Sequence, residues 1–348
     1  MTSSEISKPR GYWEFWAEDA RRTGSKLYAR LAAAIAEDDA LKTLAARAQK
    51  GQPHANMILG AAHFLLLRGI DHPLKRFYAT LGGRARAEED DPFPDFRDFV
   101  LGHENEIGRL IETRVTNTNE VARSSILHPG FRAVAEACGE PLHLVEIGPS
   151  AGLNLIWDRY GVRYIHDGQT VAEISPDAEL VLDCELRGEG KPPTASTPVV
   201  ASRVGLELNP VDLSNQDDRD WLRALIWPDE VARMGRFEKA LMLAEKAKPE
   251  IRRGDALELL TDALAAIPVN DAACVYHTIA VYQFSKEMRD ALESILTVAG
   301  MRRPVARLSL EYNGLDAELT WIRYVDGTRD EKLLAISHPH GRWLEWRA

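Results

Sequence analysis

The spacing of apolar residues divides the chain into a helical first part and a second part in which strands and helices alternate. Over residues 1–127, apolar positions recur every three or four residues, as at Leu27, Leu31 and Ile35. This period predicts amphipathic helices. Glycine and proline interrupt the pattern at several points and separate roughly five to seven helices of ordinary length. We therefore expect residues 1–127 to form an all-helical region.

Residues 128–348 carry short apolar runs that alternate with turns and helical segments. Strands separated by helices pair in parallel and are covered on both faces, so the pattern predicts a Rossmann-like, three-layer α/β domain. Two later runs joined by a turn at Asp326-Gly327 predict antiparallel edge strands. Residues 154–203 form an insertion with a hairpin, which we expect to lie over the functional site. The five parallel strands are predicted at LHLVEIG (142–148), VGLEL (204–208), EIRRGDA (250–256), AACVYHTI (272–279) and PVARLSLEY (304–312).

The turn after the first strand carries the main candidate chemistry. The segment from Glu146 to Gly152 has the pattern E-x-G-x-S-x-G, and a helix is expected from about Ala151. Small residues between a strand and a helix allow backbone N–H groups to approach a ligand. The shorter pattern G-x-S-x-G also matches the nucleophile elbow of an α/β-hydrolase, with Ser150 as the nucleophile. The strands that should precede such an elbow are missing from the predicted pattern, so we prefer a ligand-binding turn.

The same turn resembles the first motif of class I S-adenosylmethionine-dependent methyltransferases. That resemblance implies S-adenosylmethionine as the cofactor and assigns Glu207, at the end of the second strand, to the ribose hydroxyls. It assigns Asp255 and Ala256, after the third strand, to the adenine. Asp167 is the alternative ribose acid, because it lies close to the spacing of about 20 residues that is typical of compact dinucleotide-binding units. The turn residues that the resemblance places at the cofactor are Glu146, Gly148, Ser150 and Gly152.

Further candidates lie near the predicted ends of strands. His277 ends the fourth strand, where a general base would face a methyl acceptor. The alternative is a buried histidine with structural hydrogen bonds only. Asn117 and Glu120 match a capping box, which gives Glu120 a structural alternative as well. The side chains that we consider for the substrate pocket are Asn119, Glu120, Arg123 and Asn154.

The chain as a whole resembles a bacterial family catalogued as domain of unknown function 2332. The segments VEIGPSAGLNLIWDRY, GLELNPVDL and WLRALIWPDE carry much of this resemblance, and the similar segments cover most of both halves. The resemblance implies a methyltransferase-like sheet and no particular reaction. Three functions therefore remain open: methyl transfer to a small molecule, non-catalytic binding of a nucleotide or another ligand on the same fold, and a serine esterase that uses Ser150.

Charge and cysteine content restrict the partners. The chain has 43 Lys and Arg against 53 Asp and Glu, a net charge of −10, which disfavours binding to nucleic acids and anionic membranes. No apolar run is long enough to span a bilayer. Cys138, Cys184 and Cys274 form no C-x-x-C pair, as expected in a reducing compartment. We expect a cytoplasmic protein with a small-molecule substrate, without a metal, a membrane or a nucleic-acid partner; the oligomeric state is left open.

Overall fold

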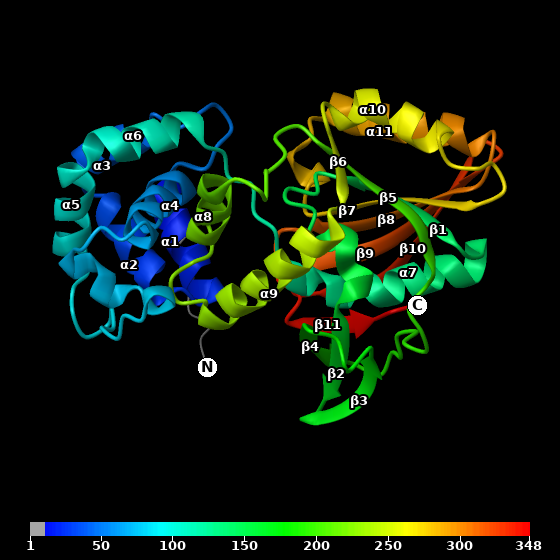
Figure 1. Ribbon diagram of the computed structural model, residues 1–348, viewed down its shortest axis with the longest axis horizontal. Coiled ribbons are helices and arrows are strands. Elements are labelled where there is room, and N and C mark those ends of the chain that lie inside the picture. Colours follow the sequence, from blue (N-terminus) through cyan, green and yellow to red (C-terminus); the bar gives the residue numbers. More distant parts are fainter. Residues whose placement is uncertain (1–10) are drawn as a thin grey trace, which may run out of the picture. The chain divides into compact units, whose positions relative to one another are not determined.

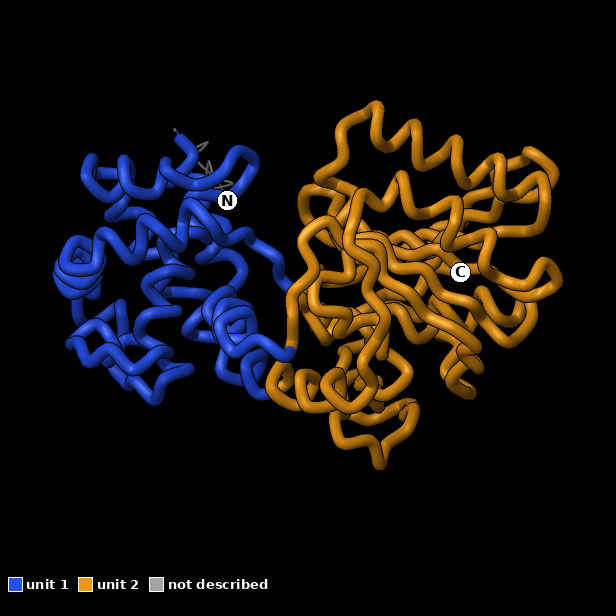
Figure 2. Tube along the Cα trace, turned by 45° about the horizontal axis from the view of Figure 1, so that its top comes forward, with its two compact units in different colours: residues 1–118, 214–235 blue, residues 119–213, 236–348 orange. Residues whose placement is uncertain are grey.

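The computed structural model describes residues 11–348 and divides the chain into two compact units (Figure 2). The helical unit contains the part of the chain through Thr118 together with Ser214–Gly235. The α/β unit contains Asn119–Leu213 and Arg236–Ala348. The division falls before the expected boundary at residue 127, because helix α7 (Ser124–Cys138) packs in the core of the α/β unit.

The helical unit encloses one hydrophobic core. Helix α4 (His54–Leu67) is apolar on nearly all sides and almost wholly buried, as expected for a central helix. Helix α8 (Gln216–Ala224) comes from the middle of the chain and places the ring of Trp221 6.0 Å from that of Phe64. This packing explains why Ser214–Gly235 belongs to the unit. The other helices are α1 (Tyr12–Thr23), α2 (Lys26–Ile35), α3 (Asp39–Ala45), α5 (Phe93–Gly102), α6 (Glu104–Thr113) and the 3-10 helices η1 (Pro73–Phe77) and η2 (Ala79–Leu81).

The α/β unit is built on an eleven-stranded sheet in the order β3-β2-β4-β11-β10-β9-β8-β7-β1-β5-β6 (Figure 1). All five predicted parallel strands are present, and they lie side by side as β6-β5-β1-β7-β8. The prediction of a largely parallel α/β sheet preceded by helices is confirmed. The strands are β1 (Leu142–Ile147), β5 (Val200–Glu207), β6 (Glu250–Arg253), β7 (Ala272–Thr278) and β8 (Val305–Tyr312).

The parallel strands have the doubly wound order 3-2-1-4-5 when they are numbered along the chain. The order reverses between β1 and β7, and ligands of open α/β sheets bind at such a switch point, outside the carboxyl ends of the strands. Helices α10 (Ala256–Ala265) and α11 (Lys286–Gly300) cover one face of the sheet. Helix α7 and the 3-10 helix η4 (Asn154–Arg159) cover the other, which gives three layers. The residues of helix α9 (Val231–Ala247) are divided between the units, with those through Gly235 assigned to the helical unit and those from Arg236 on to the α/β unit.

The C-terminal part of the sheet is antiparallel, as predicted. Strands β8, β9 and β10 form a meander with the Asp326-Gly327 turn between the last two, and β11 pairs with β10. The edge of β11 is covered by strand β4, which pairs with it in parallel. The remaining strands are β2 (Gly161–His166), β3 (Gln169–Ile174), β4 (Val181–Arg187), β9 (Ala317–Val325), β10 (Thr328–Ser337) and β11 (Trp343–Trp346).

The expectation that residues 154–203 lie over the functional site is wrong for most of this segment. Its hairpin and the following strand extend the sheet beyond β11, at the end far from the switch point in strand order. An exposed strand edge has unpaired backbone groups, and the inserted strands satisfy those of β11. Within residues 11–348, every helix is too short or too polar to span a bilayer.

Candidate functional site

The turn from Gly148 to Gly152 bends sharply after β1. The φ angles of Gly148, Ser150 and Gly152 are 69°, 56° and 74°, in the left-handed region that favours glycine. A Cβ atom at Gly152 would lie 3.1 Å from the Ile251 side chain and 3.1 Å from that of Pro249. The turn leads into η4, a 3-10 helix, so the α-helix expected from about Ala151 is not formed. The backbone of the turn itself, and no helix N-terminus, is therefore what β1 presents to a ligand.

Strand β5 and the side-chain amide of Asn119 hold the turn in place. A Cβ atom at Gly205 would lie 2.5 Å from Cγ of Pro149, so only glycine leaves room for the turn at this point of β5. The Asn119 side chain donates from Nδ2 to the Pro149 carbonyl at 3.1 Å and accepts at Oδ1 from the Leu153 N–H at 2.9 Å. Asn119 thus holds both ends of the turn, which is a positioning role for this predicted pocket residue.

Glu207 connects the end of β5 to the same turn. Its Oε2 atom accepts a hydrogen bond from the Ser150 N–H at 2.9 Å, and Oε1 accepts one from the Asn209 N–H at 3.0 Å. Each carboxylate oxygen can accept a second hydrogen bond. The rival acid, Asp167, is exposed in the hairpin between β2 and β3, far from the switch point in strand order. Of the two acids, Glu207 is the one that meets the turn.

Glu146, at the end of β1, is fully buried. Its Oε2 atom accepts a hydrogen bond from the Tyr276 hydroxyl at 2.9 Å, whereas Oε1 has no hydrogen-bond partner among residues 11–348. Burial raises the pKa of Glu146 to about 8; the nearby Glu207 carboxylate adds to the rise, and Tyr276 and Arg123 oppose it. The carboxyl group is therefore largely protonated at neutral pH. Tyr276, on β7, is its polar partner.

Asn154 and Ser124 lie beside this pair. The Tyr276 hydroxyl is 3.2 Å from the Asn154 carbonyl, and Ser124 Oγ donates to Asn154 Oδ1 at 3.0 Å. The buried Nδ2 group of Asn154 has no hydrogen-bond partner in the part of the chain that the structure describes. An unpartnered donor and an unpartnered acid oxygen therefore flank one tyrosine hydroxyl, and buried polar groups of this kind need a water molecule or a ligand group.

Arg123 and Glu120 are also buried, and both make contacts to backbone. Arg123 donates from Nη1 to the Thr278 carbonyl at 3.0 Å, beyond which β7 ends, and from Nε to the Pro339 carbonyl at 2.9 Å. Glu120 caps the short helix η3 (Val121–Arg123) through the Ala122 N–H at 3.1 Å. The expected capping box that begins at Asn117 is wrong, because Glu120 itself is the N-cap.

Asp255 and Ala256 follow β6, next to Glu207. Asp255 is the N-cap of α10 and accepts a hydrogen bond at Oδ1 from the Leu257 N–H at 2.8 Å. The Gly254 N–H donates to the Glu207 carbonyl at 3.0 Å, so the ends of β5 and β6 are joined at the site. Ala256 is the first, buried residue of α10. The ends of β1, β5 and β6 thus bring the predicted cofactor residues together.

His277 has no ring nitrogen available for general-base chemistry. Nδ1 is 2.5 Å from Glu311 Oε1, and Nε2 accepts a hydrogen bond from Arg307 Nε at 2.9 Å. Burial and the Arg307 charge lower the pKa of His277 against the opposing effect of Glu311, so the ring is neutral. The structural alternative for His277 is therefore the one that the geometry supports. Glu311 is not among the predicted site residues, although it has the same sequence signal as Glu146 and Glu207, an acid at the end of a strand.

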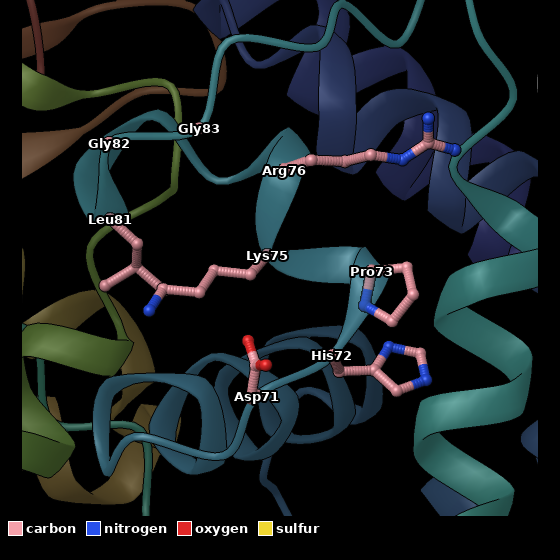
Figure 3. A pocket seen from close by; sticks show the side chains of 8 residues that line it. All are labelled: Asp71, His72, Pro73, Lys75, Arg76, Leu81, Gly82 and Gly83. Atoms are coloured by element: carbon pink, nitrogen blue, oxygen red, sulfur yellow. The ribbon is translucent and has the colours of Figure 1, made fainter.

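A separate hollow of about 560 Å³ lies in the helical unit (Figure 3). Two of its polar side chains have structural partners: Arg76 pairs with Asp90 and Asp95, and His72 with Asp98. In Figure 3, Arg76 and His72 extend away from Lys75, in agreement with these pairs. Among residues 11–348, no three His, Cys, Asp or Glu side chains are grouped so that they could hold a metal ion.

Comparison with known proteins assigns the chain to a family without assigning a reaction. No curated protein and no solved structure matches it. A family model described as "Uncharacterized protein conserved in bacteria (DUF2332)" matches residues 13–346, nearly the whole chain. The chain therefore belongs to the DUF2332 family of bacterial proteins.

Proposed function

We propose that this protein binds S-adenosylmethionine at the switch point of its sheet and transfers the methyl group to a small molecule. One observation carries the proposal: the Glu207 carboxylate on β5 lies 2.9 Å from the Ser150 N–H in the turn after β1. A small-residue turn and an acid on the adjacent strand are the two parts that hold a nucleoside in a doubly wound fold. Here they form one hydrogen-bonded unit.

The residues present fit such a cofactor. Gly148 and Gly152 let the backbone of the turn come close to a ligand, and the free lone pairs of Glu207 would accept from the ribose hydroxyls. Asp255, at the end of β6, has one oxygen engaged as an N-cap and a second that would accept from the adenine amine. At the same end of the sheet, Glu146 Oε1 and Asn154 Nδ2 are buried and have no hydrogen-bond partner among the described residues. S-adenosylmethionine supplies a methyl group on a sulfonium, and the protein then needs mainly to orient donor and acceptor.

The state of His277 restricts the acceptor. Because both ring nitrogens are engaged, His277 would not remove a proton from the acceptor. This favours acceptors that are methylated without a protein base, such as a carboxylate, a thiolate or an uncharged amine. It also supports the second candidate function, a non-catalytic protein that binds a nucleotide-like ligand at the same residues.

The engaged histidine also weighs against a serine esterase. Ser150 does have the left-handed backbone of a nucleophile elbow. A triad needs a histidine nitrogen that accepts the serine proton, and in His277 the ring is held by Arg307 and Glu311 instead. We therefore assign Ser150 to the turn, where its backbone would contact the ligand.

The proposal predicts how three acids respond to replacement by the corresponding amide. We expect S-adenosylmethionine and S-adenosylhomocysteine to bind the purified protein in calorimetry. Glu207→Gln should weaken binding by about 1–3 kcal/mol, since a buried ribose would lose its charged acceptor. Asp167→Asn, in the distant hairpin, is the matched control and should leave the affinity unchanged. Asp255→Asn keeps the helix cap and should weaken binding through loss of the charge.

Two results would contradict the proposal. The first is the absence of any binding of either compound to protein whose circular dichroism shows it to be folded. The second is a loss of affinity in Asp167→Asn but not in Glu207→Gln, which would assign the ribose to the inserted hairpin.

A further inference from the structure

The residue that follows β7 has an unfavourable backbone conformation. Ile279 has a φ of 52°, and its N–H donates to the Leu310 carbonyl on β8 at 2.7 Å. A β-branched residue rarely adopts the left-handed region, and such strain persists only where the surroundings impose it. It is found most often at ligand-binding and catalytic sites. The question is which group imposes it here.

Glu311, at the end of β8, holds the residues that follow Ile279. Its Oε1 atom accepts hydrogen bonds from the N–H groups of Ala280 and Val281 at 3.1 and 3.0 Å, and Oε2 accepts one from the Tyr282 N–H at 3.1 Å. Three consecutive backbone donors therefore converge on one carboxylate. Hydrogen bonds to a charged acceptor are stronger than neutral ones, so this arrangement fixes the loop from Ile279 to Tyr282.

His277 in turn fixes the Glu311 carboxylate. Arginine only donates hydrogen bonds, so the Arg307 contact at 2.9 Å makes Nε2 of His277 the acceptor and leaves the proton on Nδ1, facing Glu311. The Nη1 atom of Arg307 donates to Oε1 of Glu293 on α11 at 2.5 Å. Burial alone would raise the pKa of Glu311, but the His277 hydrogen bond and the loop N–H groups lower it. The carboxylate is therefore ionised and anchored from the core of the unit.

The loop touches the turn that carries the proposed cofactor site. A Cβ atom at Gly148 would lie 3.0 Å from the Cβ atom of Ala280. Strands β1 and β7 are parallel neighbours with Glu146 opposite Tyr276, so both segments leave the sheet at the switch point. The loop also presents the Tyr282 side chain, which is 54% exposed although its backbone is held. A rigid loop with an exposed aromatic ring is suited to ligand contact.

We propose that Glu311 is a positioning residue of the ligand site: it holds Ile279–Tyr282 against the Gly148–Gly152 turn, so that loop and turn form one ligand-binding wall. The ligand part of this inference rests on the proposed function, whereas the positioning part does not. His277 acts through Glu311 and has no direct part in the chemistry. This positioning role explains why the buried network of ionisable side chains on β7, β8 and α11 ends on three backbone N–H groups at the switch point.

The test compares two glutamates of the same network. Glu311→Gln removes the charge that the loop binds, whereas Glu293→Gln removes the charge beyond Arg307 and touches no loop residue. Amide hydrogen exchange is measured for Ala280–Tyr282, for Ser150–Gly152 and, as a core reference, for Val275. Affinity for S-adenosylhomocysteine is measured on the same proteins.

We expect Glu311→Gln to speed exchange in the loop and the turn by about tenfold or more and to weaken binding by a similar factor, since hydrogen bonds to a charged group are lost. Exchange at Val275 should stay unchanged, and Glu293→Gln, which acts only through Arg307, should change loop exchange, turn exchange and affinity less than Glu311→Gln does. Three results would each overturn the inference. The first is unchanged loop exchange in Glu311→Gln, and the second is faster loop exchange with unchanged turn exchange or unchanged affinity. The third is an equal effect of both variants. The exchange measurements need no ligand, so they decide the positioning part of the inference even if the unmodified protein binds no S-adenosylhomocysteine. Absence of binding would count against the proposed function and the ligand part that rests on it.

Discussion

At the scale of single residues, the proton on Glu146 is the feature with the clearest physical consequence. The carboxyl group is fully buried and receives one hydrogen bond from Tyr276, while its other oxygen has no partner within residues 11–348. An ionised carboxylate in such a place is costly, because water no longer solvates it. The group therefore keeps its proton in the folded protein up to a pH of about 8, and loses it near 4.5 in the unfolded chain.

This difference predicts how stability depends on pH. A folded-state pKa above the unfolded value stabilises the protein fully at low pH, and the contribution is lost as the pH rises toward the folded pKa. Between pH 5 and 8, Glu146 should therefore lower the free energy of unfolding by up to about 1.4 kcal/mol per pH unit. Glu146→Gln should remove this slope. The stability of the variant relative to the unmodified protein should therefore be higher at pH 8 than at pH 5.

Denaturant unfolding at several pH values measures this slope. Glu258→Gln, an exposed site on α10, is the matched control and should follow the unmodified protein. Parallel pH profiles for the Glu146 variant and the unmodified protein would show that Glu146 is ionised in the folded state, contrary to the prediction.

The sequence predicts where the site residues lie better than it predicts their hydrogen bonds and roles. Glu146, Glu207 and Asp255 were placed correctly at the ends of strands, because the end of a buried strand is visible in the hydrophobic pattern. The role of His277 could not be seen, since its two partners, Arg307 and Glu311, lie on a different strand. Hydrogen bonds between side chains on neighbouring strands depend on the register of the strands, and a single sequence does not show that register.

At the scale of elements, the turn after β1 depends on a missing side chain in the strand beside it. Gly205 on β5 leaves the space that Pro149 fills, and Asn119 then holds the two ends of the turn. A methyl group at position 205 would lie 2.5 Å from Cγ of Pro149, which is too close for any real contact, so the turn would have to move.

Gly205→Ala should therefore destabilise the protein by about 1–3 kcal/mol and speed exchange of the Ser150 N–H, whose hydrogen bond to Glu207 depends on the position of the turn. Gly235→Ala is the matched control, because a Cβ atom there meets nothing within 4 Å. In the interior of α9 it should instead stabilise the protein slightly, since alanine favours the helix. Equal stability of the two variants in denaturant unfolding would show that the turn does not rest on Gly205.

Elements were predictable where their pattern is local. The five parallel strands and the Asp326-Gly327 hairpin follow from short apolar runs and a turn signal. The expected helix at Ala151 was wrong because the turn bends back over Gly205 and continues as a kinked 3-10 helix. The course of residues 154–203 was wrong as well, because the edge of β11 that these strands cover is formed by the last residues of the chain.

At the scale of the whole molecule, the helical unit is made of two separate parts of the chain. Helix α8 lies far along the sequence, yet the Trp221 indole donates to the Val115 carbonyl at 2.8 Å, and Leu225 is buried in the same core. The local helical pattern predicted the N-terminal helices, but no local pattern shows that α8 joins them. The two units therefore differ from the division at residue 127 that the sequence suggested.

This arrangement predicts that the first part of the chain cannot be removed without exposing α8. A fragment of residues 119–348 would leave the apolar face of α8 uncovered, and exposed patches of this kind promote association. A second fragment, in which a Gly/Ser linker of equal length replaces Ser214–Gly235, lacks that face. We expect the first fragment to bind a hydrophobic dye and elute as a large species in gel filtration, and the second to elute as a folded monomer or small oligomer. If both fragments behave alike, α8 does not depend on the N-terminal helices for its burial.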